Sequence, residues 1–246
     1  VNGAKVWNRY EKSYNGKDNS RGIIGKALNG IYGYRTEGYI NSQDEVPIVY
    51  NNVGMSAPMG GIQYYKPGDL KFVDVNGDGS IGRGDQVYLG SALPEISGGI
   101  VSELKWKGFD LNMLFQGAAM NDIYLEGTMA HPFESQGSAT KLQYEDHWTP
   151  ENTDAKYPRV YNAPVDHNKV TSSHWMRNAA YLRLKSLELG YTLPEQITAK
   201  AGMSRVRFYF AGQNLWTWTP FMDEKIDPEA GNTDGRYYYQ QQAFSF

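Results

Sequence analysis

The feature that most constrains the fold is a pair of strand-like segments joined by a two-residue turn. In Phe109–Gln116 every second side chain is apolar and most of the others are polar, with Leu114 the exception. A period of two is typical of a β-strand with two unlike faces. Residues 96–106 form a second strand-like run, and the intervening Lys107-Gly108 favours a tight turn. The sequence therefore predicts a β-hairpin.

Further segments have β-strand character. Residues 181–191 alternate, but their apolar phase slips near Lys185-Ser186, which indicates a β-bulge. Residues 205–210 alternate without a slip. Residues 22–40 mix β-forming residues with glycines, which suggests a kinked strand, and the tail 237–246 alternates less regularly. We therefore expect an all-β fold, and the strand-like segments add up to about six or seven strands.

The connections between these segments differ in length. Residues 41–94, 120–177 and 219–236 are long and irregular, whereas Lys107-Gly108 and 193–204 are short. If successive strands run in opposite directions, the long connections share one end of the sheet. Long extracellular loops and short periplasmic turns are typical of outer-membrane β-barrels. We therefore expect the three long stretches to be extracellular loops, whereas the polar N-terminal residues 1–21 are expected to be irregular.

Composition excludes several classes of protein. The 246 residues include no cysteine, which excludes disulfide frameworks and thiolate metal sites. The net charge of −3 gives no basic excess for nucleic-acid binding. No apolar run approaches the roughly 20 residues that a membrane helix needs. With 19 Tyr and 27 Gly, the composition suits either a soluble β-protein or one that crosses a membrane with β-strands.

The two arginines of residues 205–210 bear on that choice. Arg205 and Arg207 share one phase, opposite Val206, Phe208 and Phe210. An arginine on the lipid face costs roughly 2–4 kcal/mol at the bilayer midplane, so a barrel would place both in its lumen. A soluble β-sandwich would show the same alternation. The pattern alone leaves both folds open.

Six segments stand in a characteristic order: YRTEGYI at 34–40, PGDLKFVDVNGDG at 67–79, GFDL with FQG and NDIY at 108–124, WTPEN with YPR at 148–159, YLRLK with LGYTLP at 181–194, and GQNLWTW at 212–218. Together they resemble the signatures of the SusC/RagA family, the TonB-dependent outer-membrane transporters of Bacteroidota. The resemblance covers residues 31–246.

The resemblance implies that residues 1–246 are the C-terminal portion of an antiparallel transmembrane β-barrel of about 22 strands in the bacterial outer membrane. It implies a nutrient importer of oligosaccharides or peptides, not an enzyme. Its implied partners are a SusD-like surface lipoprotein and, through an N-terminal part, TonB-ExbB-ExbD. The family's N-terminal plug and TonB-contacting segment are not found here, and the chain begins at Val1 without a signal peptide. We therefore expect a fragment of a longer protein.

One segment has the spacing of a calcium-binding loop. Within Asp74–Asp85, Gly79 stands where such a loop turns sharply, and the expected ligands are Asp74, Asn76, Asp78, Ser80 (through its carbonyl) and Asp85. Oxygen ligands of this kind suit Ca²⁺, which would stiffen an external loop as a structural cofactor. Asp85 replaces the usual bidentate Glu, which predicts modest affinity. The alternative is a polar Asx-Gly turn without metal. If the protein's function depends on this loop, the alternative to an outer-membrane importer is an extracellular calcium-stabilised β-rich binding or adhesion module.

Other chemistry-bearing residues give no catalytic site. The four histidines, His131, His147, His167 and His174, lack the spacing of metal ligands. The carboxylates Glu145, Asp146 and Glu151 lie near Trp148, but side chains this close in an irregular loop are expected to be solvated rather than a glycosidase pair. No catalytic residue is therefore assigned.

Aromatic residues near the C-terminus have two interpretations. Trp216, Trp218, Tyr209 and the three tyrosines Tyr237–Tyr239 could form a belt at the membrane boundary, where amphipathic rings are favoured. They could instead line a substrate path. The sequence assigns no substrate-binding residue.

Overall fold

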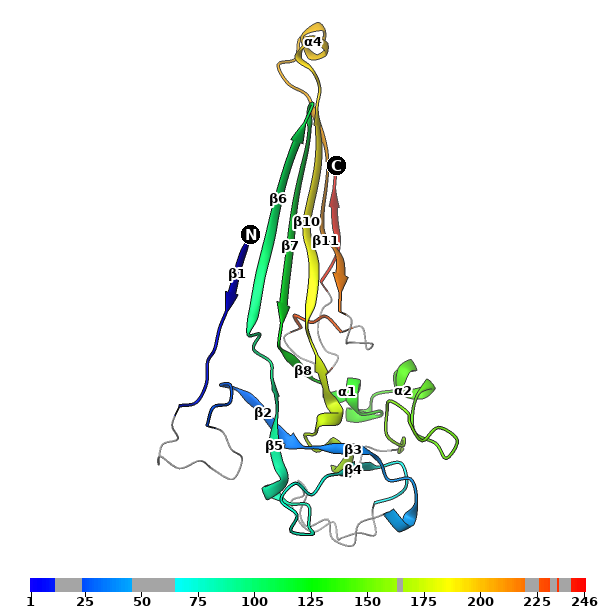
Figure 1. The fold of residues 1–246 in the computed structure, drawn as a ribbon. Helices are drawn as coiled ribbons and strands as arrows, with labels where there is room; N and C mark the ends of the chain where they lie inside the picture. Colours follow the sequence, from blue (N-terminus) through cyan, green and yellow to red (C-terminus); the bar gives the residue numbers. More distant parts are fainter. Residues whose placement is uncertain (12–23, 46–64, 163–165, 220–225, 231–233, 235–239) are drawn as a thin grey trace.

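The computed structural model describes residues 1–11, 24–45, 65–162, 166–219, 226–230, 234 and 240–246. Its largest element is a six-stranded antiparallel sheet, which we call the wall (Figure 1). In spatial order its strands are β1 (Asn2–Lys5), β6 (Ile96–Trp106), β7 (Phe109–Ala119), β10 (Tyr181–Thr192), β11 (Arg207–Trp218) and β12 (Ala243–Ser245). The all-β prediction is confirmed, and the described strands form an open sheet rather than a closed barrel.

The predicted hairpin is present. Trp106 pairs with Phe109 at the end of β6 and β7. The two turn residues between them, Lys107 and Gly108, both have positive φ, 46° and 89°. Two consecutive positive φ values are typical of a type I′ turn, whose twist matches that of the flanking strands. This turn and the short helix α4 (Glu195–Thr198) lie at the same end of the wall (Figure 1).

The predicted β-bulge in residues 181–191 is also present. The pairing of β10 with both neighbours shifts between Leu184 and Ser186, and relative to β7 the inserted residue is Lys185. On β11 the matching irregularity falls at Asn214, which has a φ of 52°. The sequence-based strand at 205–210 was therefore too short, because the chain passes through this irregularity and continues to Trp218.

Below the wall in Figure 1 lies a second part that we call the cap, formed by the described residues of 24–45, 65–95 and 120–180. It contains three two-stranded sheets: β2 (Gly30–Tyr34) with β5 (Gln86–Ser91), β3 (Thr36–Tyr39) with β4 (Leu70–Phe72), and β8 (Asp122–Tyr124) with β9 (Met176–Asn178). Its α-helices are α1 (Gly127–Ala130), α2 (Lys141–Glu145) and α3 (Asp166–Lys169). Its 3-10 turns are η1 (Gln43–Glu45), η3 (Arg83–Asp85), η4 (Glu134–Gln136) and η5 (Ser173–Trp175), while η6 (Ala199–Ala201) follows α4.

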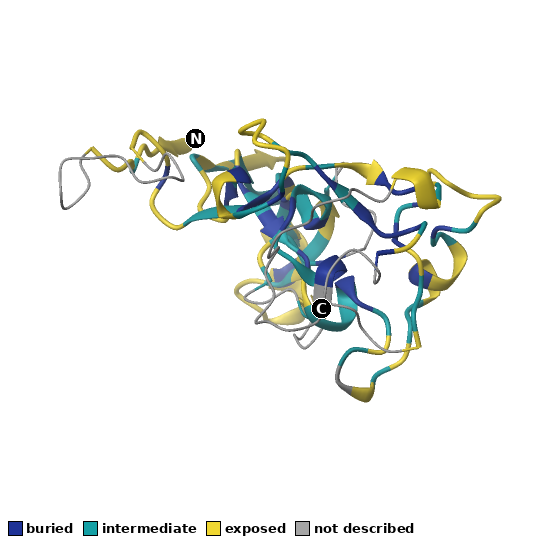
Figure 2. Ribbon diagram, turned by 90° about the horizontal axis from the view of Figure 1, so that it is seen from below, coloured by how far each residue is buried: buried dark blue, intermediate teal, exposed yellow. Residues whose placement is uncertain are grey.

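The hydrophobic core lies in the cap. Its largest fully buried side chains are Trp175, Tyr34 and Tyr157, and Ile226 joins it from the segment between β11 and β12. Figure 2, viewed from the cap end, shows the buried residues gathered there. The apolar side chains of the wall belong to no such core and are largely exposed.

Two predictions about the N-terminal half were wrong. Residues 22–40 are not one kinked strand, since their described part forms β2 and β3, which separate at Arg35 and pair with β5 and β4. Residues 1–21, expected to be irregular, contribute β1 to the wall. Asn2 pairs with Gly99 far along the chain, a contact that no local pattern encodes.

Candidate functional site

The wall has one apolar face. Alternate residues of a strand point to opposite sides, and the registers of β6, β7, β10 and β11 place a continuous set of apolar side chains on one side. This set is Ile100, Leu104, Trp106, Phe109, Leu111, Met113, Phe115, Leu182, Leu184, Leu187, Leu189, Tyr191, Phe208, Phe210, Trp216 and Trp218. Outside the bulges these four strands place no charged residue on this side. Trp106 is 67% exposed and Phe208 64%, so nothing in the described chain covers the face.

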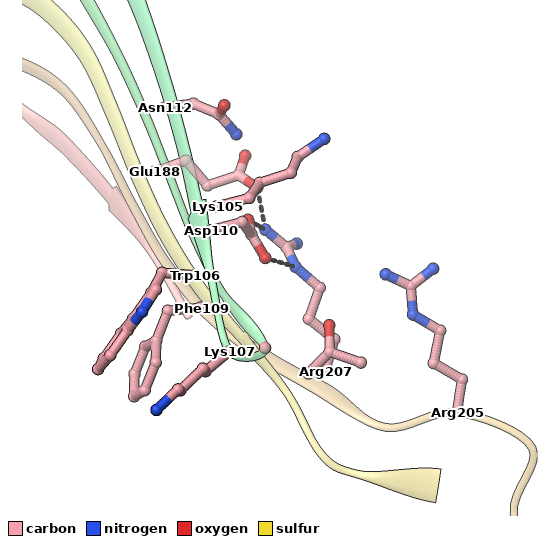
Figure 3. A pocket seen from close by; sticks show the side chains of 11 residues that line it. Lys105, Trp106, Lys107, Phe109, Asp110, Asn112, Glu188, Arg205 and Arg207 are labelled. Carbon is pink, nitrogen blue, oxygen red and sulfur yellow. Dashed lines mark hydrogen bonds and ion pairs between the residues drawn. The ribbon is translucent and has the colours of Figure 1, made fainter.

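The opposite face of the same strands is mainly polar. It carries Ser97, Glu103, Lys105, Asp110, Asn112, Gln116, Arg183, Ser186, Glu188, Arg207, Tyr209, Gln213 and Thr217, with Val101 and Leu114 as apolar exceptions. The prediction that Arg207 lies opposite Phe208 and Phe210 is confirmed. Figure 3 shows Arg205 on the same side as Arg207, and Trp106 and Phe109 on the other.

An ion-pair cluster joins three strands on the polar face, near the turn end. The guanidinium of Arg207 on β11 lies 2.5 Å from Asp110 on β7 and 2.5 Å from Glu188 on β10 (Figure 3). The cluster lines an open hollow of about 770 Å³ together with Lys105 and Arg205. This end of the polar face is therefore charged.

A second hollow, of about 590 Å³, lies on the polar face nearer the cap. Its lining is uncharged and largely small, and includes Asn2, Ser97, Gly99, Gln116 and Tyr181. Amides and hydroxyls of this kind offer hydrogen bonds to neutral polar molecules. The two hollows of the polar face therefore differ, because the one at the turn end has a charged lining and the one nearer the cap has an uncharged lining.

The aromatic residues near the C-terminus do not form one belt. Trp216 and Trp218 pair with Leu184 and Leu182 and lie on the apolar face, about half exposed. Tyr209 lies on the polar face, where the guanidinium of Arg207 is 5.5 Å from its ring centroid. Tyr209 therefore faces the opposite side of the wall from Trp216 and Trp218, so a belt formed by those two tryptophans would not include it. Tyr237–Tyr239 lie outside the described residues.

The Asp74–Asp85 loop is closed by its own hydrogen bonds. Asp74 accepts backbone N–H bonds from Gly77 and Gly79, each at 2.7 Å, and these bonds lower the pKa of its carboxyl. Asp85, fully buried, accepts bonds from Val75, Asn76 and Gly82. Asp78 accepts the N–H of Ser80 at 2.9 Å. A calcium ion would compete with backbone donors for these carboxylates, and its binding stays a prediction.

A buried carboxylate that the sequence analysis missed organises part of the cap. Asp69, fully buried, accepts hydrogen bonds from Tyr161, at 2.8 Å, and from the side-chain amide of Asn168, at 2.9 Å. The Nε2 atom of His167 lies 2.8 Å from it, and the backbone N–H of Lys66 also donates to it at 2.8 Å. The cluster fastens the segment before β4 to Tyr161, His167 and Asn168. Its partners are far apart in sequence, so no spacing signals it.

The histidines have separate environments. His131 is buried with its ring against Trp175, and burial lowers its pKa to about 4. His174 packs against the same tryptophan, whereas His147 contacts the carbonyl of Tyr144. Across the part of the chain that the structure describes, no three His, Cys, Asp or Glu side chains converge in the manner of a metal site, so calcium binding by the Asp74–Asp85 loop would require its carboxylates to exchange backbone donors for the ion.

The three carboxylates near Trp148 lie in ordinary structural environments. The Asp146 side chain accepts a hydrogen bond from the amide of Asn152 at 3.3 Å, and Glu145 pairs with Lys141 on the surface of α2. Glu151 is exposed. None of the helices described here is long and apolar enough to cross a membrane.

Comparison with known proteins identifies relatives along most of the chain. It is 32% identical over 220 residues to TonB-dependent receptor P26 of Formosa agariphila, which covers 88% of this chain and 21% of the relative. It is 32% identical over 206 residues to TonB-dependent receptor P3 of the same organism and 27% identical over 172 residues to TonB-dependent receptor SusC of Bacteroides thetaiotaomicron. The chain spans about a fifth of the length of these curated relatives. No family model matches the chain.

Solved structures with the same fold agree with these relatives. The RagAB peptide transporter superposes on 90% of this chain with a TM-score of 0.60 at 23% identity, and the match covers 22% of that structure's chain. The RagAB peptide importer in its open-open state superposes on 86% with a TM-score of 0.58. The wall and cap therefore have the fold of one portion of an outer-membrane barrel transporter.

Proposed function

This chain belongs to the SusC/RagA family of TonB-dependent receptors, and from this premise we propose that the protein of which it is part imports oligosaccharides or peptides. Members of this family are outer-membrane proteins of Bacteroidota, and the chain is a portion of their barrel. Its relatives are receptors and transporters, not enzymes. The import function, its substrates and its partners are the proposal.

The observation that carries the proposal is the wall with two unlike faces. An uncovered apolar face several strands wide is unfavourable in water but suits the hydrocarbon core of a bilayer, where each buried apolar side chain is stabilising. The polar face would then line an aqueous lumen. As part of a closed barrel, a sheet with this arrangement would let a hydrophilic solute pass a membrane without contact with lipid.

The proposed partners follow from the kinship. A SusD-like surface lipoprotein would deliver the substrate at the cap end, and TonB-ExbB-ExbD would supply energy through the N-terminal part of the parent protein. The RagAB structures are described as a peptide importer, which favours peptides; the kinship with SusC keeps oligosaccharides as a second substrate class. The neutral hollow near the cap suits either class, since both offer uncharged hydrogen-bonding groups.

The cap is proposed to face the extracellular side. It contains the described parts of 41–94 and 120–177, and it lies at the opposite end of the wall from the Lys107-Gly108 turn (Figure 1). Loops of this size stand on the extracellular side of outer-membrane barrels. An adhesion module would need no apolar face on its sheet, so the wall disfavours that alternative.

The test is uptake by the native organism with and without the intact parent gene. Cells are supplied with either a panel of oligosaccharides or a panel of peptides as sole carbon source. We expect the deletion strain to lose growth on one panel and to regain it when the gene is restored. Equal growth of the deletion strain on every member of both panels would overturn the proposed function.

A further inference from the structure

Arg183 is a buried cation on the polar face of the wall. It pairs with Gln116 on β7 and Thr217 on β11, near the cap end, and is 2% exposed. Its Nε donates to the hydroxyl of Thr217 at 3.0 Å. The remaining donors of its guanidinium leave the wall and reach another part of the chain.

That other part is the segment between β11 and β12. Arg183 donates to Asp227 at 2.8 Å and to Glu229 at 2.5 Å, and it also hydrogen-bonds to the Gln240 side chain. Asp227 is 9% exposed, so this ion pair is largely removed from water. The described residues of the segment therefore lie against the polar face and not beside the apolar one.

Residues Ile226–Ala230 form a compact turn held at two points. The Asp227 carboxylate accepts the N–H of Glu229, and its carbonyl accepts the N–H of Ala230, both at 2.9 Å. Ile226 is buried in the core of the cap. The turn is thus attached to the cap through Ile226 and to the wall through Arg183.

The chemistry of the contact requires arginine. Its five N–H donors in a planar fork can serve a hydroxyl, two carboxylates and an amide together, whereas a lysine ammonium has three donors around one point. Removal of one side of a buried ion pair leaves the other charge without compensation, which is strongly unfavourable. Loss of Arg183 would leave two carboxylates beside each other on the polar face.

We infer that Arg183 is a positioning residue that holds the turn Ile226–Ala230 across the polar face, so that this turn forms part of the entrance to the transport path. The inference rests on the proposed function, because only a transporter has a transport path along the polar face. The position of the turn itself can be measured without any substrate.

The experiment uses the full-length receptor in the outer membrane of intact cells, with Pro228→Cys as a reporter in the turn. These 246 residues contain no cysteine, and any cysteine in the rest of the receptor is first replaced by serine so that the reporter is the sole thiol. Labelling by a membrane-impermeant maleimide is compared between Pro228→Cys alone and the same protein with Arg183→Met. We expect labelling to become at least about tenfold faster, since loss of a buried ion pair shifts a local opening equilibrium by more than that.

Three controls separate local release from general damage. Lys185→Met removes a neighbouring cation whose Nζ lies 3.9 Å from Glu229, a weak contact, and whose side chain is a third exposed. This substitution should leave labelling unchanged. Ala155→Cys reports on the buried cap core and should stay protected when Arg183→Met is introduced. Arg183→Lys, which keeps the charge, should give an intermediate rate.

If Arg183→Met fails to give a heat-modifiable folded barrel, Asp227→Asn replaces it, with an expected smaller acceleration. The inference is overturned by unchanged labelling in the folded variants, or by an equal gain in labelling of the Ala155→Cys reporter, which would indicate a merely structural role. Failure of the unaltered receptor to import any substrate would instead overturn the proposed function, and the labelling result would stand.

Discussion

Arg207 passes directly over Gly190 to reach Asp110, two strands away. Gly190 on β10 pairs with Asp110 on one side and Tyr209 on the other. A Cβ at Gly190 would lie 2.3 Å from an Nη atom of Arg207. The missing side chain on the middle strand therefore provides the space in which a cation of β11 pairs with a carboxylate of β7.

We expect Gly190→Val to displace the Arg207 guanidinium from Asp110 and to lower the temperature at which the full-length barrel unfolds. Gly3→Ala is the matched control, because the nearest atom to a Cβ there is 3.8 Å away. In a double-mutant cycle, Gly190→Val should have little further effect in the Arg207→Gln background. Additive effects on the unfolding temperature would contradict this relationship.

Adjacent residues of β10 should differ sharply in their tolerance of charge. Leu187 lies on the apolar face and Ser186 on the polar face. We expect Leu187→Arg to reduce the free energy of unfolding in lipid vesicles by roughly 2–4 kcal/mol, because the charge would enter the hydrocarbon region. Ser186→Arg should cost far less. Urea titration followed by electrophoretic mobility measures both, and equal tolerance would refute the assignment of the two faces.

The cap should lose stability as the pH falls between 6.5 and about 4, through His131. Its pKa is lowered by burial, so over this range the unfolded chain binds a proton that the folded cap does not. Stability therefore rises with pH across the window, by on the order of 3 kcal/mol at most. His131→Phe should flatten the dependence of cap proteolysis on pH, whereas His147→Gln, at a half-buried site away from Trp175, should not. An unaltered pH profile in His131→Phe would disprove the role of this ring.

The Asp74–Asp85 loop should bind Ca²⁺ weakly, with a dissociation constant of about 10⁻⁴–10⁻³ M, a range typical of extracellular modules. We expect Asp78→Asn to weaken binding measured by calorimetry on the full-length protein, and Asp44→Asn, a substitution in the exposed turn η1, to leave it unchanged. Absence of any calcium-dependent heat would favour the metal-free turn. Without calcium, the stability of the loop should still depend on pH. The hydrogen bonds accepted by Asp74 stabilise the loop at pH values above the ordinary carboxyl pKa. This stabilisation is lost as the pH falls through the lowered pKa of Asp74.

The parts of the fold that could be predicted from sequence are those with a local cause. The Lys107-Gly108 turn and the bulge at Lys185 follow from neighbouring residues, since a tight turn and a slip of phase are visible within a few positions. Strand β11 was predicted only in its first half, because Gly212 to Asn214 resemble a turn in sequence. In the structure Gly212 and Gln213 stay paired with β10, and the strand resumes after the left-handed residue Asn214.

The contacts of the site could not be predicted, because they join distant parts of the chain. Arg183 is separated from Asp227 by 44 positions and Asp69 from Asn168 by 99. Alternation assigns Arg183 to a face but not to a partner. The family resemblance supplied the larger context, and the structure supplied the pairings.

The location of the core in the cap has a consequence for biogenesis. The cap buries Trp175, Tyr34 and Tyr157 among its own residues and can exclude water by itself. The apolar side of the wall is not covered by the described chain, and its contact with water is unfavourable. The two parts thus require different solvents to reach their native state. While the nascent chain is still in an aqueous compartment, its wall segments are exposed hydrophobic strands that need escort, and they acquire their stabilising environment only on insertion.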